Sequence, residues 1–104
     1  MGLDITIREH KGTDEKGFLI MKTPSEELPY STDRLVIRHE LSKNIDFEVL
    51  KCNDYYSWEE YYRPKDFDEA FKWCDTLKGG EYNYVKALLD SLKMDDNYWL
   101  EYGY

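Results

Sequence analysis

The chain opens with alternating apolar and polar positions. Leu3, Ile5 and Ile7 are each separated by one polar residue, which is the period of a half-buried strand. Residues 11–17 contain two glycines and an aspartate and predict a hairpin turn, after which residues 18–22 predict a second strand. The N-terminal part is therefore expected to begin with a β-hairpin.

Two further strands are predicted before residue 52. Residues 34–40 place Leu35, Ile37 and His39 on one face, and residues 45–50 alternate apolar side chains with acidic ones. Residues 41–44 suit either a turn or an irregular loop between them.

Helical spacing dominates the second half. Ser57 and Glu60 have the spacing of a capping box, which predicts a short helix to about residue 63, stopped by Pro64. Asp66 begins a second such pattern, whose apolar face repeats at helical spacing as far as Leu77, with Gly79 as its stop. A third helix is expected over residues 81–93, with its core stripe formed by Val85, Leu88, Leu89 and Leu92.

Residues 98–104 alternate again and predict a terminal strand. Strands grouped first, helices grouped later and a returning strand favour an α+β fold over parallel winding. We expect a small, mainly antiparallel sheet made of the N-terminal strands and the C-terminal strand, packed against two or three helices from the second half. The length of 104 residues fits a single domain over residues 1–104.

Charge narrows the range of partners. The chain has 22 acidic and 14 basic residues and a net charge of −8. Residues 1–52 carry 10 acids and 8 bases, whereas residues 53–104 carry 12 acids and 6 bases together with 14 of the 17 aromatic residues. Direct binding to nucleic acid through its phosphates is disfavoured, because that affinity comes from basic side chains. The expected partner is basic.

The N-terminus has neither a basic segment nor the apolar run of a secretory leader, and no apolar stretch approaches the length of a membrane span. We therefore expect a cytoplasmic protein, with no membrane partner.

No catalytic or cofactor motif is present. A metal site would need His10, His39, Cys52 and Cys74 to converge without any ligand-pair spacing, and we expect neither a metal nor a cofactor. A thiol nucleophile at Cys52 would require a neighbouring histidine such as His39, but an incidental thiol fits better, and Cys74 is expected on the buried face of a helix. The sequence therefore indicates a protein that is not an enzyme.

Aromatic and acidic residues are interleaved between residues 54 and 69. Five aromatic residues within eight positions cannot all be buried by one helix, so some should be exposed, as at binding hot spots. The acids among them either imitate nucleic-acid phosphates for a basic partner or simply form a solvated face above a tyrosine-rich core. The predicted protein-binding residues are Tyr56, Trp58, Glu59, Glu60, Tyr61, Tyr62, Asp66, Asp68 and Glu69.

Two segments carry a resemblance. The opening residues 1–6, Met-Gly-Leu-Asp-Ile-Thr, and residues 62–68, Tyr-Arg-Pro-Lys-Asp-Phe-Asp, lead into a helix with Trp73. In these segments the chain resembles small phage- and prophage-encoded proteins that begin with Met-Gly-Leu-Asp. The resemblance implies a phage or mobile-element setting, and hence the cytoplasm of a host cell. It transfers no activity and no site residue.

These observations lead to one main hypothesis and two alternatives. The main hypothesis is a non-enzymatic inhibitor of anti-CRISPR or anti-restriction type, which binds a basic site on a host defence protein and so mimics nucleic acid. A nucleotide-binding module would instead stack a base on Trp58, Trp73 or Trp99 and meet a phosphate with Arg34, Arg38 or Arg63. A minor virion structural or assembly protein fits the composition as well. In each case a homodimer is expected through the terminal strand, because an edge bearing Tyr102 and Tyr104 invites pairing.

Overall fold

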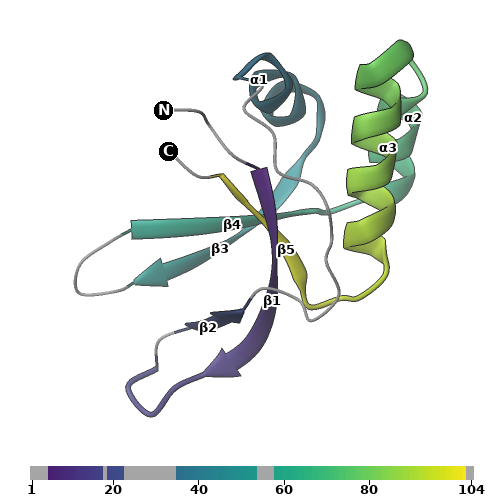
Figure 1. Ribbon diagram of the computed structural model, residues 1–104. Helices are drawn as coiled ribbons and strands as arrows, with labels where there is room; N and C mark the ends of the chain where they lie inside the picture. The colour runs from purple at the N-terminus through teal and green to yellow at the C-terminus, as the bar shows by residue number, and fades with distance from the viewer. Residues whose placement is uncertain (1–4, 18, 23–34, 54–57, 103–104) are drawn as a thin grey trace.

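Five antiparallel strands form one sheet, and three helices accompany it (Figure 1). The computed structural model describes residues 5–17, 19–22, 35–53 and 58–102. In chain order the elements are β1 (Ile5–Thr13), β2 (Leu19–Lys22), α1 (Leu35–Asn44), β3 (Phe47–Asn53), β4 (Trp58–Pro64), α2 (Phe67–Cys74), α3 (Gly79–Lys93) and β5 (Tyr98–Tyr102). The predicted α+β class is confirmed, with two of the three helices in the second half.

The strand order is β2-β1-β5-β4-β3, with every neighbouring pair antiparallel. The expected homodimer interface is therefore wrong, because β5 lies in the middle of the sheet rather than at an edge. Its backbone pairs with β1 on one side and with β4 on the other, so Tyr102 lies within the sheet opposite Ile5. Tyr104 lies outside the described residues.

The N-terminal hairpin is confirmed, although β1 extends further than expected. The turn covers residues 14–17 and is shorter than predicted. The Asp14 carbonyl accepts a hydrogen bond from the Gly17 N–H, and the Asp14 side chain accepts one from the Lys16 N–H. Gly12 has a φ of 103°, which other residues rarely adopt, and it lies where the register with β2 shifts. This irregularity allows β1 to continue to Thr13.

The strand predicted over residues 34–40 is wrong, since residues 35–44 form α1. Leu41 and Ile45 are both buried, and the Ile45 N–H donates to the Leu41 carbonyl at 2.9 Å. Ile37, Leu41 and Ile45 are spaced by four residues, a helical period that competes with the alternation at the start of the segment. The strand expected over residues 45–50 is confirmed in shifted form as β3.

The short helix predicted from Ser57 is also wrong, because residues 58–64 form β4. Ser57 itself lies outside the described residues. β4 pairs along its whole length with β3 and, at Tyr61 and Tyr62, with β5. Tyrosine and tryptophan suit a half-buried pleated surface, and pairing on both sides outweighs the local capping signal.

The two remaining helices follow their predicted patterns. The Asp66 side chain accepts from the backbone N–H groups of Asp68 and Glu69 and caps α2. α2 ends at Cys74, earlier than expected, and Gly79 adopts a left-handed φ of 66° at the boundary with α3. The buried face of α3 consists of Val85, Leu88, Leu89, Ser91 and Leu92, which includes the whole predicted stripe.

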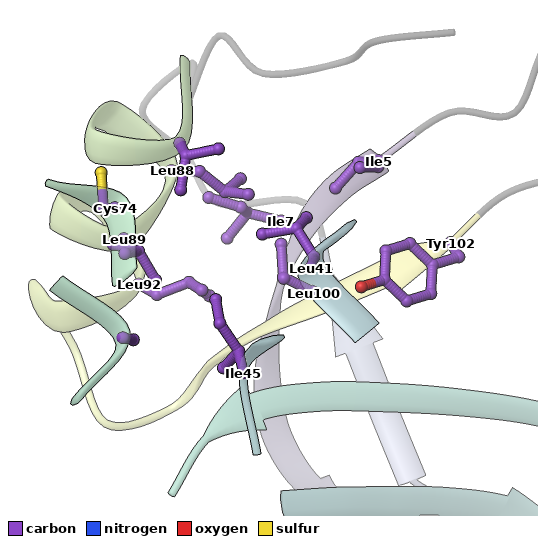
Figure 2. Packing of buried hydrophobic residues seen from close by; sticks show 12 residues of the cluster. Ile5, Ile7, Leu41, Ile45, Cys74, Leu88, Leu89, Leu92, Leu100 and Tyr102 are labelled. Carbon is purple, nitrogen blue, oxygen red and sulfur yellow. The ribbon is translucent and has the colours of Figure 1, made fainter. Parts of the chain in front are cut away.

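The main core lies between one face of the sheet and the helices (Figure 2). Ile7 and Leu100 face Leu88, Leu89 and Leu92 across this layer, and Cys74 is fully buried as expected. The opposite face holds a second, smaller cluster in which Tyr61 and Trp99 are 3% and 8% exposed. It receives Leu19 and Met21 from β2 and Leu50 from β3. The two edge strands thus contribute to one cluster, which indicates a curved sheet.

None of the helices among the described residues is both long enough and apolar enough to cross a membrane.

Candidate functional site

Arg63, near the end of β4, holds together the connection from α3 to β5. Its Nη1 donates to the carbonyl oxygens of Leu92, Asp95 and Tyr98 at 2.8, 2.9 and 2.8 Å. The guanidinium also lies over the Phe67 ring, with Cζ 4.9 Å from the ring centroid. The side chain is only 11% exposed, so one buried cation links the end of α3, the start of α2 and β5.

Burial lowers the pKa of the Arg63 guanidinium, whereas the negative charges of Asp96, Asp95 and Glu48 oppose this shift. Arginine stays charged at any pH at which proteins fold. The buried positive charge therefore persists, and its strongest contacts are to backbone carbonyls. Asp96 Oδ1 lies 3.5 Å from Nη2, but its side chain is fully exposed, so this ion pair is screened by water.

The negative charges of Asp96, Asp95 and Glu48 act on this arginine. Glu48 lies directly opposite Arg63 in the β3–β4 register, and Asp46 Oδ1 is 3.7 Å from Lys65 Nζ. Asp95 and Asp96 come from the turn before β5, and Asp66 and Asp68 flank Phe67, whose ring contacts the guanidinium. We call this set the acidic rim: Asp46, Glu48, Asp66, Asp68, Asp95 and Asp96.

The rim keeps an excess of negative charge. Its cations are Arg63, which is largely but not fully buried, and Lys65, which is exposed and pairs with Asp46. Two of the acids also fix local structure, because Asp66 caps α2 and the Asp95 side chain accepts from the Asn97 N–H at 2.8 Å. The hydrogen bonds from Arg63 hold the Asp95 and Tyr98 carbonyls in place, so the rim is built on a fixed turn.

An exposed apolar side chain adjoins the rim. Met94 directly precedes Asp95 and is 65% exposed. Methionine is enriched in protein interfaces because its flexible thioether adapts to irregular apolar surfaces. The turn from α3 to β5 thus presents an apolar contact beside two carboxylates.

The structure divides the predicted binding residues. Asp66, Asp68 and Glu69 are exposed together at the start of α2, and Glu69 pairs with Lys72 at 3.3 Å. Glu60 is exposed further along β4, where its carboxylate accepts a hydrogen bond from the Tyr62 hydroxyl at 2.6 Å. These acids therefore occupy two places rather than one helical face.

The tyrosines expected as exposed anchors are packed inside. Tyr61 is buried beside Trp99 on the second face of the sheet. Tyr62 is half-buried against the main core, with its ring 5.9 Å from that of Phe47 and 5.0 Å from that of Tyr102. A strand sends these neighbouring tyrosines to opposite faces of the sheet, and each face has a cluster that receives one. Tyr56 and the side chains of Trp58 and Glu59 lie outside the described part of the chain.

Most of the described residues proposed for nucleotide binding are buried or already hydrogen-bonded within the fold. Arg63 is occupied by carbonyls, Trp99 is buried, and Trp73 is half-buried against the main core. Arg34 and the side chain of Arg38 lie outside the described residues.

The thiol nucleophile considered and disfavoured for Cys52 has no described histidine beside it. His39 is exposed on α1 rather than on a strand, and the Cys52 side chain is not among those described. Within the described ranges, no group of three histidine, cysteine or acidic side chains has the geometry of a metal site.

Sequence reasoning missed four members of the acidic rim: Asp46, Glu48, Asp95 and Asp96. The pair Asp95–Asp96 directly after a predicted helix was the available signal. Its proximity to Glu48 depends on the sheet order, which local patterns do not specify.

Comparison with protein-family models, curated proteins and solved structures finds no match to this chain.

Proposed function

We propose that this protein is a non-enzymatic inhibitor that binds a basic site on a host nucleic-acid-processing or defence protein, of the anti-CRISPR or anti-restriction type. The acidic rim occupies positions where that site would otherwise hold phosphates. The resemblance of residues 1–6 and 62–68 to phage-encoded proteins supplies the biological setting.

The observation that carries this proposal is the charge of the rim. The rim has six carboxylates from three segments, and three of them, Asp96, Asp95 and Glu48, act on a guanidinium whose hydrogen bonds go to backbone carbonyls. A partner with lysine and arginine side chains would therefore meet a surface with more carboxylates than cations, and Met94 would add an apolar contact at its edge.

Charge of this kind acts mainly on the rate of association. Each exposed ion pair contributes on the order of 0–1 kcal/mol. Long-range attraction speeds encounter, and salt screens it over a Debye length of about 10 Å at 0.1 M. Binding should thus be strong at low salt and should weaken as association slows at high salt.

The test compares two variants of equal net charge in capture from host lysate. Glu48→Gln/Asp68→Asn/Asp96→Asn removes three rim charges without touching the carboxylates that cap backbone N–H groups. Glu15→Gln/Glu81→Gln/Asp90→Asn removes three exposed charges outside the rim. Retained proteins are identified by mass spectrometry at about 50 and about 500 mM salt.

We expect the natural chain and the control to retain the same nucleic-acid-processing protein at low salt. The rim variant should bind it roughly tenfold to a hundredfold more weakly, as three ion pairs predict, and a DNA or RNA oligonucleotide should compete. Equal retention by both variants would refute the rim as the binding surface. Retention insensitive to the oligonucleotide would refute mimicry of nucleic acid.

A further inference from the structure

The two edges of the sheet differ in how well they are protected against further pairing. β2 is four residues long, and the register of β1 with it shifts between His10 and Thr13. β3 has seven residues in unbroken register with β4, and it contains neither proline nor glycine. Short strands and irregular register protect an edge, whereas a long regular one is a template for another strand.

The backbone pattern shows which groups β3 presents at this edge. Phe47 lies opposite Pro64, and the Lys65 N–H donates to the Asp46 carbonyl at 3.0 Å. In an antiparallel ladder, hydrogen-bonded and non-hydrogen-bonded residue pairs alternate. The bond between Lys65 and Asp46 marks these two residues as a hydrogen-bonded pair, so the next pair, Phe47 and Pro64, is non-hydrogen-bonded. Because the pattern alternates, the N–H and C=O groups of Phe47, Val49 and Lys51 point away from β4.

The side chains along this edge are close to neutral as a set. In the hairpin, Glu48 lies opposite Arg63 and Lys51 lies opposite Glu60. β3 itself carries one acid and one base, in contrast to the net charge of −8 for the whole chain. Val49 is 43% exposed, and with Met94 it is one of two large apolar residues exposed among those described.

We infer that β3 pairs with β3 of a second copy of this chain, antiparallel and with Val49 at the two-fold axis. In that register Val49 faces Val49 of the second copy, Phe47 faces Lys51, and Glu48 faces Leu50, so no like charges are opposed. The outward groups of the three residues supply about six hydrogen bonds across the interface. The two sheets join into one continuous sheet with the helices of both copies on the same face.

Neither α2 nor α3 covers this edge (Figure 1). The hairpin of β3 and β4 projects to the side away from α2 and α3 (Figure 1). The edge suits a second copy rather than a strongly basic segment, because β3 itself carries one acid and one base and no net charge. Pairing therefore places the neutral part of a strongly acidic molecule at the interface.

The experiment measures mass and association by sedimentation velocity over a concentration series. The natural chain should shift from about 12.5 kDa toward roughly 25 kDa. Higher salt should favour the dimer, because it screens the repulsion between two copies of like net charge. This is the opposite of the salt effect expected for a basic target, so the two proposals fail separately.

Substitutions at Val49 test the register. Val49→Lys and Val49→Glu should each be monomeric, since like charges then face each other at the axis, whereas an equimolar mixture of the two should form a heterodimer. Met94→Lys, at the other exposed apolar residue, should dimerise as the natural chain does. A natural chain that stays monomeric, or a Val49→Lys dimer, would overturn the proposal. Dimerisation of Val49→Glu alone, through Lys51 of the second copy, would overturn the register.

Amide hydrogen exchange of the natural chain tests the same pairing without any substitution. Amide exchange of Phe47, Val49 and Lys51 should slow as concentration rises, because these N–H groups become bonded only in the dimer. The neighbouring amides of Glu48 and Leu50, which face β4, should change little. Uniform exchange at all concentrations would contradict pairing through this edge.

Discussion

Replacing Arg63 with methionine should destabilise the protein more than replacing any exposed charge. Nη1 has two hydrogens for three carbonyl acceptors, so the contacts amount to about two full hydrogen bonds. At about 1.5–3 kcal/mol each for a charged donor, they contribute roughly 3–6 kcal/mol. The cost of burying the guanidinium offsets part of this, and we expect a net loss of about 3 kcal/mol. A domain of this size has roughly 5–15 kcal/mol in total.

The assay is urea unfolding followed by far-UV circular dichroism, with a thermal scan in parallel. Arg63→Met should lower the free energy of unfolding by about 3 kcal/mol and the melting temperature by roughly 10–20 °C. Arg63→Lys should lose less, because an ammonium can still reach one carbonyl. Asp96→Asn should leave both values unchanged, because its carboxylate is fully exposed. A loss below about 1 kcal/mol for Arg63→Met would refute the anchoring of the turn by this side chain.

Three further predictions concern individual positions. Asp66→Ala should cost about 1 kcal/mol in chemical unfolding, because two N–H groups at the start of α2 lose their acceptor; an unchanged midpoint would contradict the cap. Leu100→Ala should cost about 2–5 kcal/mol in the same assay, because the side chain is fully buried in β5; a loss below 1 kcal/mol would show that the core there is loosely packed. Burial raises the pKa of the Cys74 thiol, so in a Cys52→Ser background Cys74 should react with a thiol reagent only on unfolding. Because the folded state then holds its proton more tightly, stability should fall as pH rises above about 8.5, and a Cys74→Ala variant should lack this contribution.

The local sequence pattern predicted an element correctly where only one hydrophobic period, that of a strand or that of a helix, was present. The alternation around Ile5 and Ile7 specified β1, and the helical spacing around Leu88 and Leu92 specified α3. Asp66 marked the start of α2, because a cap acts on N–H groups only two and three residues away. In each case the information lies within one element.

Where the sequence fitted both a strand and a helix, contacts with other elements of the fold determined which one formed. The segment before Leu41 reads as a strand by alternation and as a helix by its four-residue spacing, and burial of Leu41 and Ile45 favours the helix. The Ser57 signal predicted a helix, but two flanking strands pair with Tyr61 and Tyr62. β3 directly precedes β4 in the chain, but β5 follows only after α2 and α3, so a local pattern does not contain this second partner.

Some features of the candidate site also follow from a single element, whereas others depend on contacts between elements. The exposure of Asp68 and Glu69 follows from their place in the first turn of a capped helix. The contribution of Glu48 and Asp96 requires β3 and the α3–β5 turn to meet at Arg63. The exposure expected of Tyr61 failed because the sheet has an apolar cluster on both faces.

The central position of β5 affects how the newly synthesised chain folds. Arg8 and Glu101 are joined by a 3.0 Å ion pair although they lie 93 positions apart. Among the described strands, the N-terminal hairpin and the β3–β4 hairpin are connected through β5, which lies between them. During synthesis the two hairpins are therefore made before the strand that joins them into one sheet. Such distant pairing slows folding relative to local contacts, and a chain truncated before β5 lacks the strand that joins the two hairpins.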